Sequence, residues 1–405
     1  MKPSAGFRIT VMMFFEYFVW SAWYVTIGTF MGQTLKFDGT EIGLVYSALS
    51  IAAILSPVFV GKIADRYFSS QNVLGVLHLI CAALMYFASL QEDFLLMYIA
   101  ILLYSMSYMP TIALTNAIAM AQMENPGKQF PIVRVFGTIG WIVMGLILGF
   151  LEIEAKSTPL LISSIVSLFF GLYCFTLPNV PPKKSEGTPG IIELLGLDAL
   201  ALLKDRSFAV LIICSLLVSI PLAFYYSFTN LFLNDINFEN AAGKMTIGQF
   251  SEVIFMLLMP FMFKRLGVKN MILIGMAAWV GRYLFFGFGN TGALVGFLYA
   301  GILLHGICYD FFFVTAQIYV DNKAPKNLKN SAQGLITMVT YGAGMFIGSW
   351  VAGYSVDLFT VEGEKLWQEI WMIPASIALI VMIIFSLFFK EDTRKGSIGV
   401  EGSGI

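Results

Sequence analysis

Twelve apolar stretches, each long enough to cross a bilayer, fill this chain of 405 residues almost from end to end. A helix needs about 20 apolar residues to span roughly 30 Å of hydrocarbon. The stretches predict spans at 7–34, 41–64, 70–90, 94–122, 134–152, 158–178, 207–234, 244–265, 269–288, 291–321, 329–357 and 367–390. With 12% charged residues and a mean hydropathy of +0.80, the chain is too apolar for a soluble domain. We expect an all-α, multi-pass membrane protein.

Basic residues fall in alternate gaps between these stretches. If the N-terminus is inside, the cytoplasmic segments hold 19 of the 24 Lys and Arg residues. The outer segments hold Lys36, Lys156, Lys244 and Lys365, and Arg282 lies inside a span. Because Lys and Arg are retained on the cytoplasmic side, this asymmetry predicts that both termini are cytoplasmic. Helical spans favour the inner membrane of a two-membrane cell.

The longest polar interval divides the spans six and six. It opens with a segment rich in Pro, Gly and charge, after which Ile191 to Lys204 repeats apolar residues at helical spacing. That spacing predicts a helix lying at the cytoplasmic surface. The expected organisation is an N-terminal six-helix bundle (1–178), a cytoplasmic linker with an interfacial helix (179–206), a C-terminal six-helix bundle (207–395) and a flexible tail (396–405).

The sequence offers little that indicates an enzyme. The four cysteines fall in predicted spans without paired spacing, so we expect neither a disulfide nor a zinc or other metal site. A net charge of -1 predicts no nucleic-acid partner. A membrane enzyme or a sensor without transport is the disfavoured alternative, because no Ser/His/Asp set or Gly-rich nucleotide loop lies at a water interface.

Ionisable side chains are rare inside the predicted spans. They are Glu16, Arg134, Glu252, Arg282 and Asp310, with His78 and His305 as titratable neighbours. Such groups are costly in hydrocarbon, so those that remain face a cavity or a partner. A functional role is favoured for Glu252, a mid-span carboxylate with an amide one turn away. A structural role is the alternative for Arg282, and His78 is interpreted as a packing residue.

Helical spacing places several of these groups on shared faces with aromatic side chains. The faces are Arg134, Thr138 and Trp141; Gln249 and Glu252; His305, Tyr309 and Phe313; and Glu16, Trp20 and Trp23. A cavity with a cation, a carboxylate, an amide, a hydroxyl and large rings suits a polar solute with a flat ring. Simple packing is the favoured interpretation for Trp20, Trp23 and Phe313 taken singly.

Six plus six spans with a cytoplasmic linker resemble the layout of the major facilitator superfamily. The segment Gly61-Lys-Ile-Ala-Asp65-Arg66, between the second and third spans, resembles the G-x-x-x-D-R loop of that superfamily. We expect Gly61 to allow close helix approach, and Asp65 and Arg66 to pair across helix ends as a cytoplasmic gate. The segment Lys264–Asn270 is a degenerate copy without the Asp.

Nearly the whole chain resembles the nucleoside:proton symporters of this superfamily. Matching stretches include Thr34–Gly39, Tyr46-Ser47, Tyr108–Thr111, Arg134–Gly140, Leu195–Ala199, Gln249–Glu252, Gly267–Asn270, Asp310–Phe312 and Ser331–Gly334. The resemblance implies twelve helices around a central cavity and proton-driven uptake of nucleosides, with no cofactor besides the coupling proton. The alternatives are a transporter of the same fold for another small polar solute, such as a glycoside, and a proton-driven exporter.

The resemblance also implies a set of site residues. Substrate-binding residues would be Arg134, Thr138, Trp141, Tyr226, Gln249, Glu252, His305 and Tyr309. Proton-coupling candidates are Glu252, Asp310 and Glu16. The chain departs from the family pattern at Ala223 and Tyr226, where amides are expected, at His305, where a tyrosine is expected, and at Glu16, where an amide is expected. Nucleoside is the expected solute, and the protein partners are unknown.

Overall fold

The computed structural model describes residues 3–66, 68–182 and 196–391, without the side chains of 3, 4, 57–66 and 127. Its first half contains α1 (Pro3–Tyr24), α2 (Ile27–Thr29), a π-helix (Phe30–Leu35), α3 (Gly39–Arg66), α4 (Ser70–Ser89), α5 (Phe94–Ala121), α6 (Pro126–Leu151) and α7 (Thr158–Cys174). In this half α4 packs along α7 and α1 along α6.

The second half begins with a 3-10 helix, Leu197–Lys204, at the end of the linker. It continues with α9 (Arg206–Asp235), α10 (Ala241–Phe288), α11 (Val295–Leu303), α12 (His305–Tyr309), a π-helix (Asp310–Val314), α13 (Thr315–Lys323), a 3-10 turn (Lys326–Leu328), α14 (Lys329–Thr337), a π-helix (Met338–Gly344), α15 (Met345–Leu358), the hairpin β1 (Thr360–Val361) and β2 (Glu364–Lys365), and α16 (Trp367–Phe388). The predicted interfacial helix is a short 3-10 helix over its described part, and residues 191–195 lie outside the described residues.

Twelve membrane-spanning helices can be traced through the described residues, as the sequence predicts. The helix α10 holds two of them, because Gly267 has a φ of 70° and interrupts the helix between the eighth and ninth spans. Only glycine adopts that φ without steric cost. The tenth span is assembled from α11, α12, a π-helix and α13, and the eleventh from α14, a π-helix and α15.

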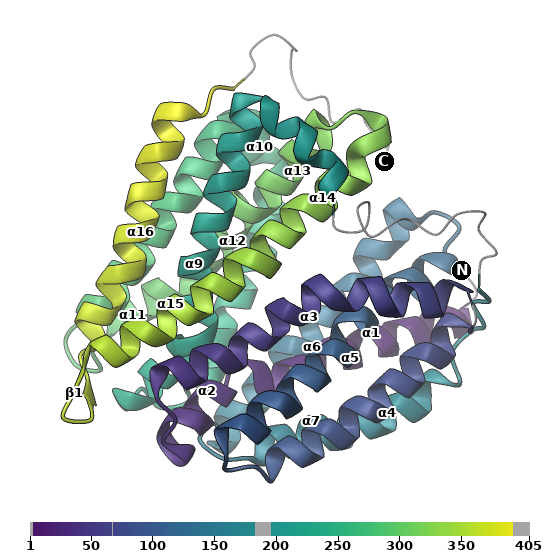
Figure 1. The fold of residues 1–405 in the computed structure, drawn as a ribbon, viewed down its shortest axis with the longest axis horizontal. Coiled ribbons are helices and arrows are strands. Elements are labelled where there is room, and N and C mark those ends of the chain that lie inside the picture. Colours follow the sequence, from purple (N-terminus) through teal and green to yellow (C-terminus); the bar gives the residue numbers. More distant parts are fainter. Residues whose placement is uncertain (1–2, 67, 183–195, 392–405) are drawn as a thin grey trace.

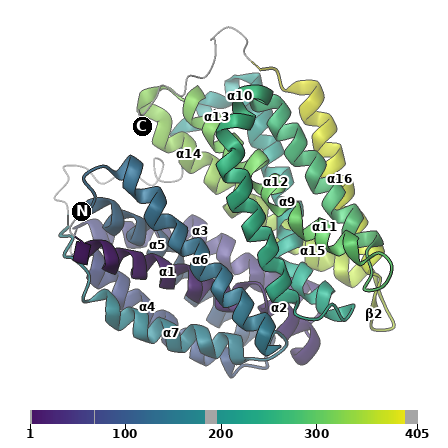
Figure 2. The same ribbon diagram turned by 180° about the vertical axis from the view of Figure 1, so that it is seen from behind.

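The two six-helix halves are inclined to each other (Figure 1). They meet at one end of the molecule, which carries α2, the β1–β2 hairpin and the connections at 152–157 and 236–240; we call it the closed end. There α3 packs against α15, α6 against α10 and α2 against α9. The start of α1 and the end of α16 lie at the other end, the open end (Figure 2). This is the major facilitator fold.

Candidate functional site

A cavity of about 170 Å³ lies between the two halves. Its walls are Tyr17, Trp20, Tyr24, Arg134, Thr138, Trp141, Tyr226, Gln249, Glu252, His305, Tyr309, Tyr341 and Met345. The first six come from α1 and α6, and the rest come from α9, α10, α12 and the eleventh span. Both halves therefore contribute to one site, so a change in their inclination changes the site itself.

All eight residues predicted to bind substrate lie in this wall. The face of α6 contributes Arg134, Thr138 and Trp141, which are three or four residues apart and so share a side of the helix. One turn of α10 brings Gln249 and Glu252 to the same space. The predicted helical faces thus converge from separate helices on a single cavity.

The two residues of α9 that depart from the family pattern lie in different surroundings. Tyr226 lines the cavity, whereas Ala223 is fully buried and packs near Gly348 of α15. The wall at this helix is therefore a phenol in place of the expected amides. Tyr226 also lies 5.4 Å from Tyr24 of the first half, measured between ring centroids.

Part of the wall was not predicted from the sequence. Tyr17 and Tyr24 on α1 line the cavity together with Trp20, and their spacing of three and four residues was the available signal. Of the predicted face containing Glu16, Trp20 and Trp23, only Trp20 lines the cavity. Trp23 is buried, and its Nε1 donates a hydrogen bond to the Tyr104 hydroxyl at 3.2 Å.

The opposite wall also contains residues of the eleventh span that the sequence did not predict. Tyr341 and Met345 line the cavity, and the hydroxyl of Tyr341 is hydrogen-bonded to that of Tyr309. The π-helix at 338–344 changes the helical register here, so constant helical spacing could not place them. Phe313 does not line the cavity; it is buried and packs against Tyr309, with ring centroids 5.5 Å apart.

An aromatic ring packs against Arg134, the predicted cation of the cavity. The guanidinium carbon of Arg134 lies 4.0 Å from the ring centroid of Tyr17, a cation–π contact that holds the side chain in place. Trp20 packs edge-on against Trp141, with centroids 5.4 Å apart. The Trp20 Nε1 is buried and has no hydrogen-bond partner among the described residues. The wall thus presents flat rings, and one of its tryptophans holds a buried N–H donor without a partner in the part of the chain that the structure describes.

The carboxylate of the cavity wall, Glu252, has its side chain 30% exposed. Its Oε2 lies 3.7 Å from Nε2 of the buried His305. The imidazole of His305 stacks on Tyr225 at 4.9 Å, and the Arg282 guanidinium lies 4.1 Å from the centre of that same ring. A series of contacting polar and aromatic side chains therefore leads from Glu252 in the cavity wall to Arg282 inside the second half.

Two of the predicted ionisable groups lie behind the wall. Arg282 is fully buried, and its Nε donates to the carbonyl of Gly301 at 3.0 Å. Asp310 is also fully buried, at the start of a π-helix, and neither carboxylate oxygen has a hydrogen-bond partner among the described residues. A buried carboxylate without a partner is costly when charged, so its role as a proton-coupling group stays a prediction with a physical basis.

The third coupling candidate, Glu16, lies in a separate polar cluster inside the first half. Its Oε2 is 3.1 Å from Nε2 of His78, and its Oε1 accepts a hydrogen bond from Thr111 at 2.6 Å. Both Glu16 and His78 are fully buried. The interpretation of His78 as a simple packing residue is incomplete, because it partners a carboxylate.

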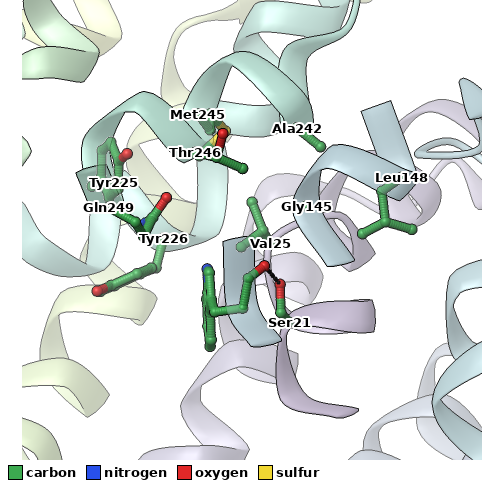
Figure 3. A pocket seen from close by; sticks show the side chains of 11 residues that line it. Ser21, Val25, Gly145, Leu148, Tyr225, Tyr226, Ala242, Met245, Thr246 and Gln249 are labelled. Atoms are coloured by element: carbon green, nitrogen blue, oxygen red, sulfur yellow. Dashed lines mark hydrogen bonds between the residues drawn. The ribbon is translucent and has the colours of Figure 1, made fainter. Parts of the chain in front are cut away.

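A small gap of about 10 Å³, room for one water molecule, adjoins the cavity toward the closed end. It shares Trp141, Tyr226 and Gln249 with the cavity and reaches Ala242 in the first turn of α10 (Figure 3). The gap therefore lies between the cavity and the helices that pack together at the closed end.

The predicted gate motif falls in the last turns of α3, which extends to Arg66, and not in a loop. The side chains of Gly61, Asp65 and Arg66 lie outside the described residues, so their pairing stays a prediction. The four cysteines are free and buried. No cluster of three metal-ligating side chains occurs in the described part of the chain.

Comparison with known proteins places these features in a family. The family model described as nucleoside H+ symporter matches residues 3–394. The chain is 44% identical to the "Putative nucleoside transporter YegT" of Escherichia coli (strain K12), over 98% of this chain and 96% of that one. It is 35% identical to the xanthosine permease of the same organism, over 96% of this chain and 97% of the relative.

Solved structures of transporters are also similar to this chain. The crystal structure of the nucleoside transporter NupG superposes with a TM-score of 0.89 and 31% sequence identity, covering 97% of this chain and all of that one. The peptide transporter PepTSo matches with a TM-score of 0.72 at 14% identity, over 96% of this chain and 98% of that one, which shows the shared fold alone.

Proposed function

This chain belongs to the nucleoside H+ symporter family, and we propose that its central cavity binds nucleosides and carries them inward together with protons. The chain is a multi-pass membrane transporter and not an enzyme. Its substrate is a small molecule. We place it in the inner membrane with both termini cytoplasmic, which the basic residues at the open end support.

The convergence of complementary groups on one cavity carries this proposal. Arg134, Thr138, Gln249 and Glu252 offer donors and acceptors for the hydroxyls of a ribose, while Trp141 and the other rings offer faces on which a base can stack. Binding sites for small molecules combine an apolar lining with a few directed polar groups in this way. A simple ion would make no use of the rings.

Alternating access supplies the mechanism. The two halves rock about the cavity, so that the site faces one side of the membrane and then the other. We propose that the coupled proton binds to Glu252 or Asp310 and that no other cofactor takes part. A carboxylate facing a dry cavity favours its neutral form, and access of water or approach of Arg134 favours the charged form. The proton adds about 2.3 kcal/mol per 100 mV of membrane potential.

Transport by purified protein in proteoliposomes tests the proposal. We expect accumulation of labelled nucleoside when the vesicle exterior is acidic, and its loss when a protonophore collapses the gradient. A thermal-shift screen with nucleosides, nucleobases, sugars and small glycosides should show stabilisation by nucleosides first. Stabilisation by glycosides alone would indicate another polar solute, and extrusion driven by an inward proton gradient would indicate an exporter.

A further inference from the structure

We propose that Glu154 and Asp357 form two matching latches that hold the closed end shut, and that both must break each time the cavity opens at that end. The proposal rests on the alternating access of the proposed function, and it adds the residues that set the balance between the two states. Each latch is a carboxylate from one half that binds the first turn of a helix in the other half.

The first latch reaches from the first half into the second. Glu154 follows α6 and is 4% exposed. Its Oε1 accepts a hydrogen bond from the backbone N–H of Ala242 at 2.8 Å, in the first turn of α10. Its Oε2 accepts from the side-chain amides of Asn230 at 2.8 Å and Asn234 at 2.7 Å on α9. Three donors of the second half thus converge on one buried carboxylate.

The second latch reaches from the second half into the first. Asp357, near the end of α15, accepts hydrogen bonds from the backbone N–H groups of Gly39 at 2.5 Å and Thr40 at 2.8 Å. Its Oδ2 also accepts from the Thr40 hydroxyl at 2.5 Å. Gly39 and Thr40 begin α3, whose first N–H groups have no partner inside their own helix. Asp357 therefore caps a helix across the interface.

The two latches occupy equivalent places in the two halves. Glu154 follows the fifth span and binds the start of the eighth, whereas Asp357 ends the eleventh and binds the start of the second. A shift of six spans, counted around the twelve, converts one latch into the other, because the fifth span becomes the eleventh and the eighth becomes the second. The halves of this fold are related by an axis along the membrane normal, so the same contact is made twice around that axis.

Glycine residues near each latch allow the two facing helix backbones to approach closely. A Cβ atom added at Gly149 of α6 would collide with the backbone of Gly243 in α10. A Cβ atom added at Gly353 of α15 would likewise collide with the backbone of Gly39. Glycine at each crossing lets the helices touch, which brings each short carboxylate within reach of the facing helix start.

The chemistry of the latch suits a contact that must be strong and reversible. Hydrogen bonds to a carboxylate are roughly twice as strong as neutral ones, and the positive end of a helix dipole favours the anion. When the closed end opens, water can replace every one of these donors. The latches therefore bias the two states without locking either of them.

Distance measurement between the halves tests the proposal without any nucleoside. Cysteines placed at the exposed positions Glu92 and Thr291, on closed-end loops of opposite halves, accept spin labels. The four native cysteines are buried, which favours selective labelling. In the unmodified latch background we expect a short distance to dominate the distribution.

Glu154→Gln should add a population with a longer distance between the two spin labels. The amide turns one acceptor into a donor that faces other donors, so we expect the ratio of long to short distances to rise about tenfold, the factor expected from losing a charge-assisted hydrogen bond. The matched control is Glu152→Gln, an exposed carboxylate two residues away, which should leave the ratio unchanged. Asp357→Asn should act like Glu154→Gln, with the exposed Glu362→Gln as its control.

The double variant should raise the ratio further than either single change. Should Glu154→Gln fail to fold, Asn234→Ala removes one donor of the same latch and is expected to raise the ratio by a smaller factor. An unchanged distribution in Glu154→Gln and Asp357→Asn, both well folded, overturns the latch proposal. Lack of nucleoside transport by the unmodified protein would instead refute the proposed function and leave the distance result intact.

Discussion

The Oε2 of Glu252 and the Nε2 of His305 lie 3.7 Å apart on the side of the cavity that the second half forms. The distance is too long for a good hydrogen bond, so the carboxylate is not fixed by its neighbour. His305 in turn is held by stacking on Tyr225. A movable carboxylate beside a fixed imidazole can accept a substrate hydroxyl or a proton without breaking a strong contact first.

Neutralising Glu252 should separate coupling from binding. Glu252→Gln keeps the size and hydrogen-bonding capacity of the side chain but cannot titrate, so concentrative uptake should collapse while counterflow of nucleoside survives. Glu252→Ala should lose both, because the substrate hydroxyl that Glu252 accepts is then left unpaired, at about 1–3 kcal/mol. Uptake and counterflow in proteoliposomes measure the two activities. Glu239→Gln, an exposed carboxylate at the closed end, is the control.

One result of these measurements would contradict the role of Glu252 in coupling. If Glu252→Gln still accumulates nucleoside against its gradient with unchanged pH dependence, Glu252 is not the coupling group, and Asp310 becomes the first candidate.

Asp310→Asn should affect transport without harming the fold. The carboxylate is fully buried and has no hydrogen-bond partner among the described residues, so an amide of the same shape removes a charge that is costly to bury. We expect an unchanged or raised melting temperature and unchanged nucleoside affinity, together with loss of proton-driven accumulation. A lower melting temperature with normal accumulation would assign Asp310 a structural role instead.

Trp20→Phe tests the buried N–H donor of the Trp20 side chain. Phenylalanine keeps an aromatic ring for stacking but lacks Nε1, so a substrate whose carbonyl accepts from Nε1 should bind about 2–10-fold more weakly, the worth of one ordinary hydrogen bond. The control is Trp23→Phe, which removes the buried hydrogen bond to Tyr104 and should lower the melting temperature without changing affinity. Isothermal titration and thermal denaturation give the two readouts; unchanged affinity in Trp20→Phe would show that Nε1 donates no hydrogen bond to the substrate.

The buried pair of Glu16 and His78 should matter for stability more than for coupling. Glu16→Ala leaves a buried imidazole without its partner and should cost about 3–5 kcal/mol in the free energy of unfolding. Glu16→Gln retains an acceptor for Thr111 and should cost less. We expect the pH profile of uptake by Glu16→Gln to match the unmodified protein. A shifted profile would show that Glu16 takes part in proton coupling, as the sequence predicts.

Much of the fold could be predicted because hydrophobic length and basic asymmetry act over whole spans. The break between the eighth and ninth spans was predictable from polar residues around Gly267, whose φ of 70° ends the helix. The π-helices at 310–314 and 338–344 were not, since a single extra residue in a helical turn leaves no compositional signal. The short hairpin at 360–365 was also hidden within an ordinary loop.

The site was predictable where one helix presents one face, as α6 does with Arg134, Thr138 and Trp141. It was not predictable where register shifts, as at Tyr341 after the π-helix begins. Pairs formed between helices also stayed hidden. Glu16 and His78 are 62 residues apart in sequence, and Glu154 meets Asn230 across 76 residues. Such pairs depend on how helices pack, which spacing within one helix cannot reveal.

The orientation in the membrane decides which side the closed end faces. Reporter fusions after Lys390 and within 183–190 should read cytoplasmic, because 19 of the 24 basic residues fall on that side. A tag inserted near Glu239, which is exposed in the closed-end connection between α9 and α10, should read external. Reporter activity and tag accessibility in intact cells measure this, with a permeabilised sample as the control. A cytoplasmic signal at Glu239 would reverse the orientation and place the Glu154 and Asp357 latches at the inner face.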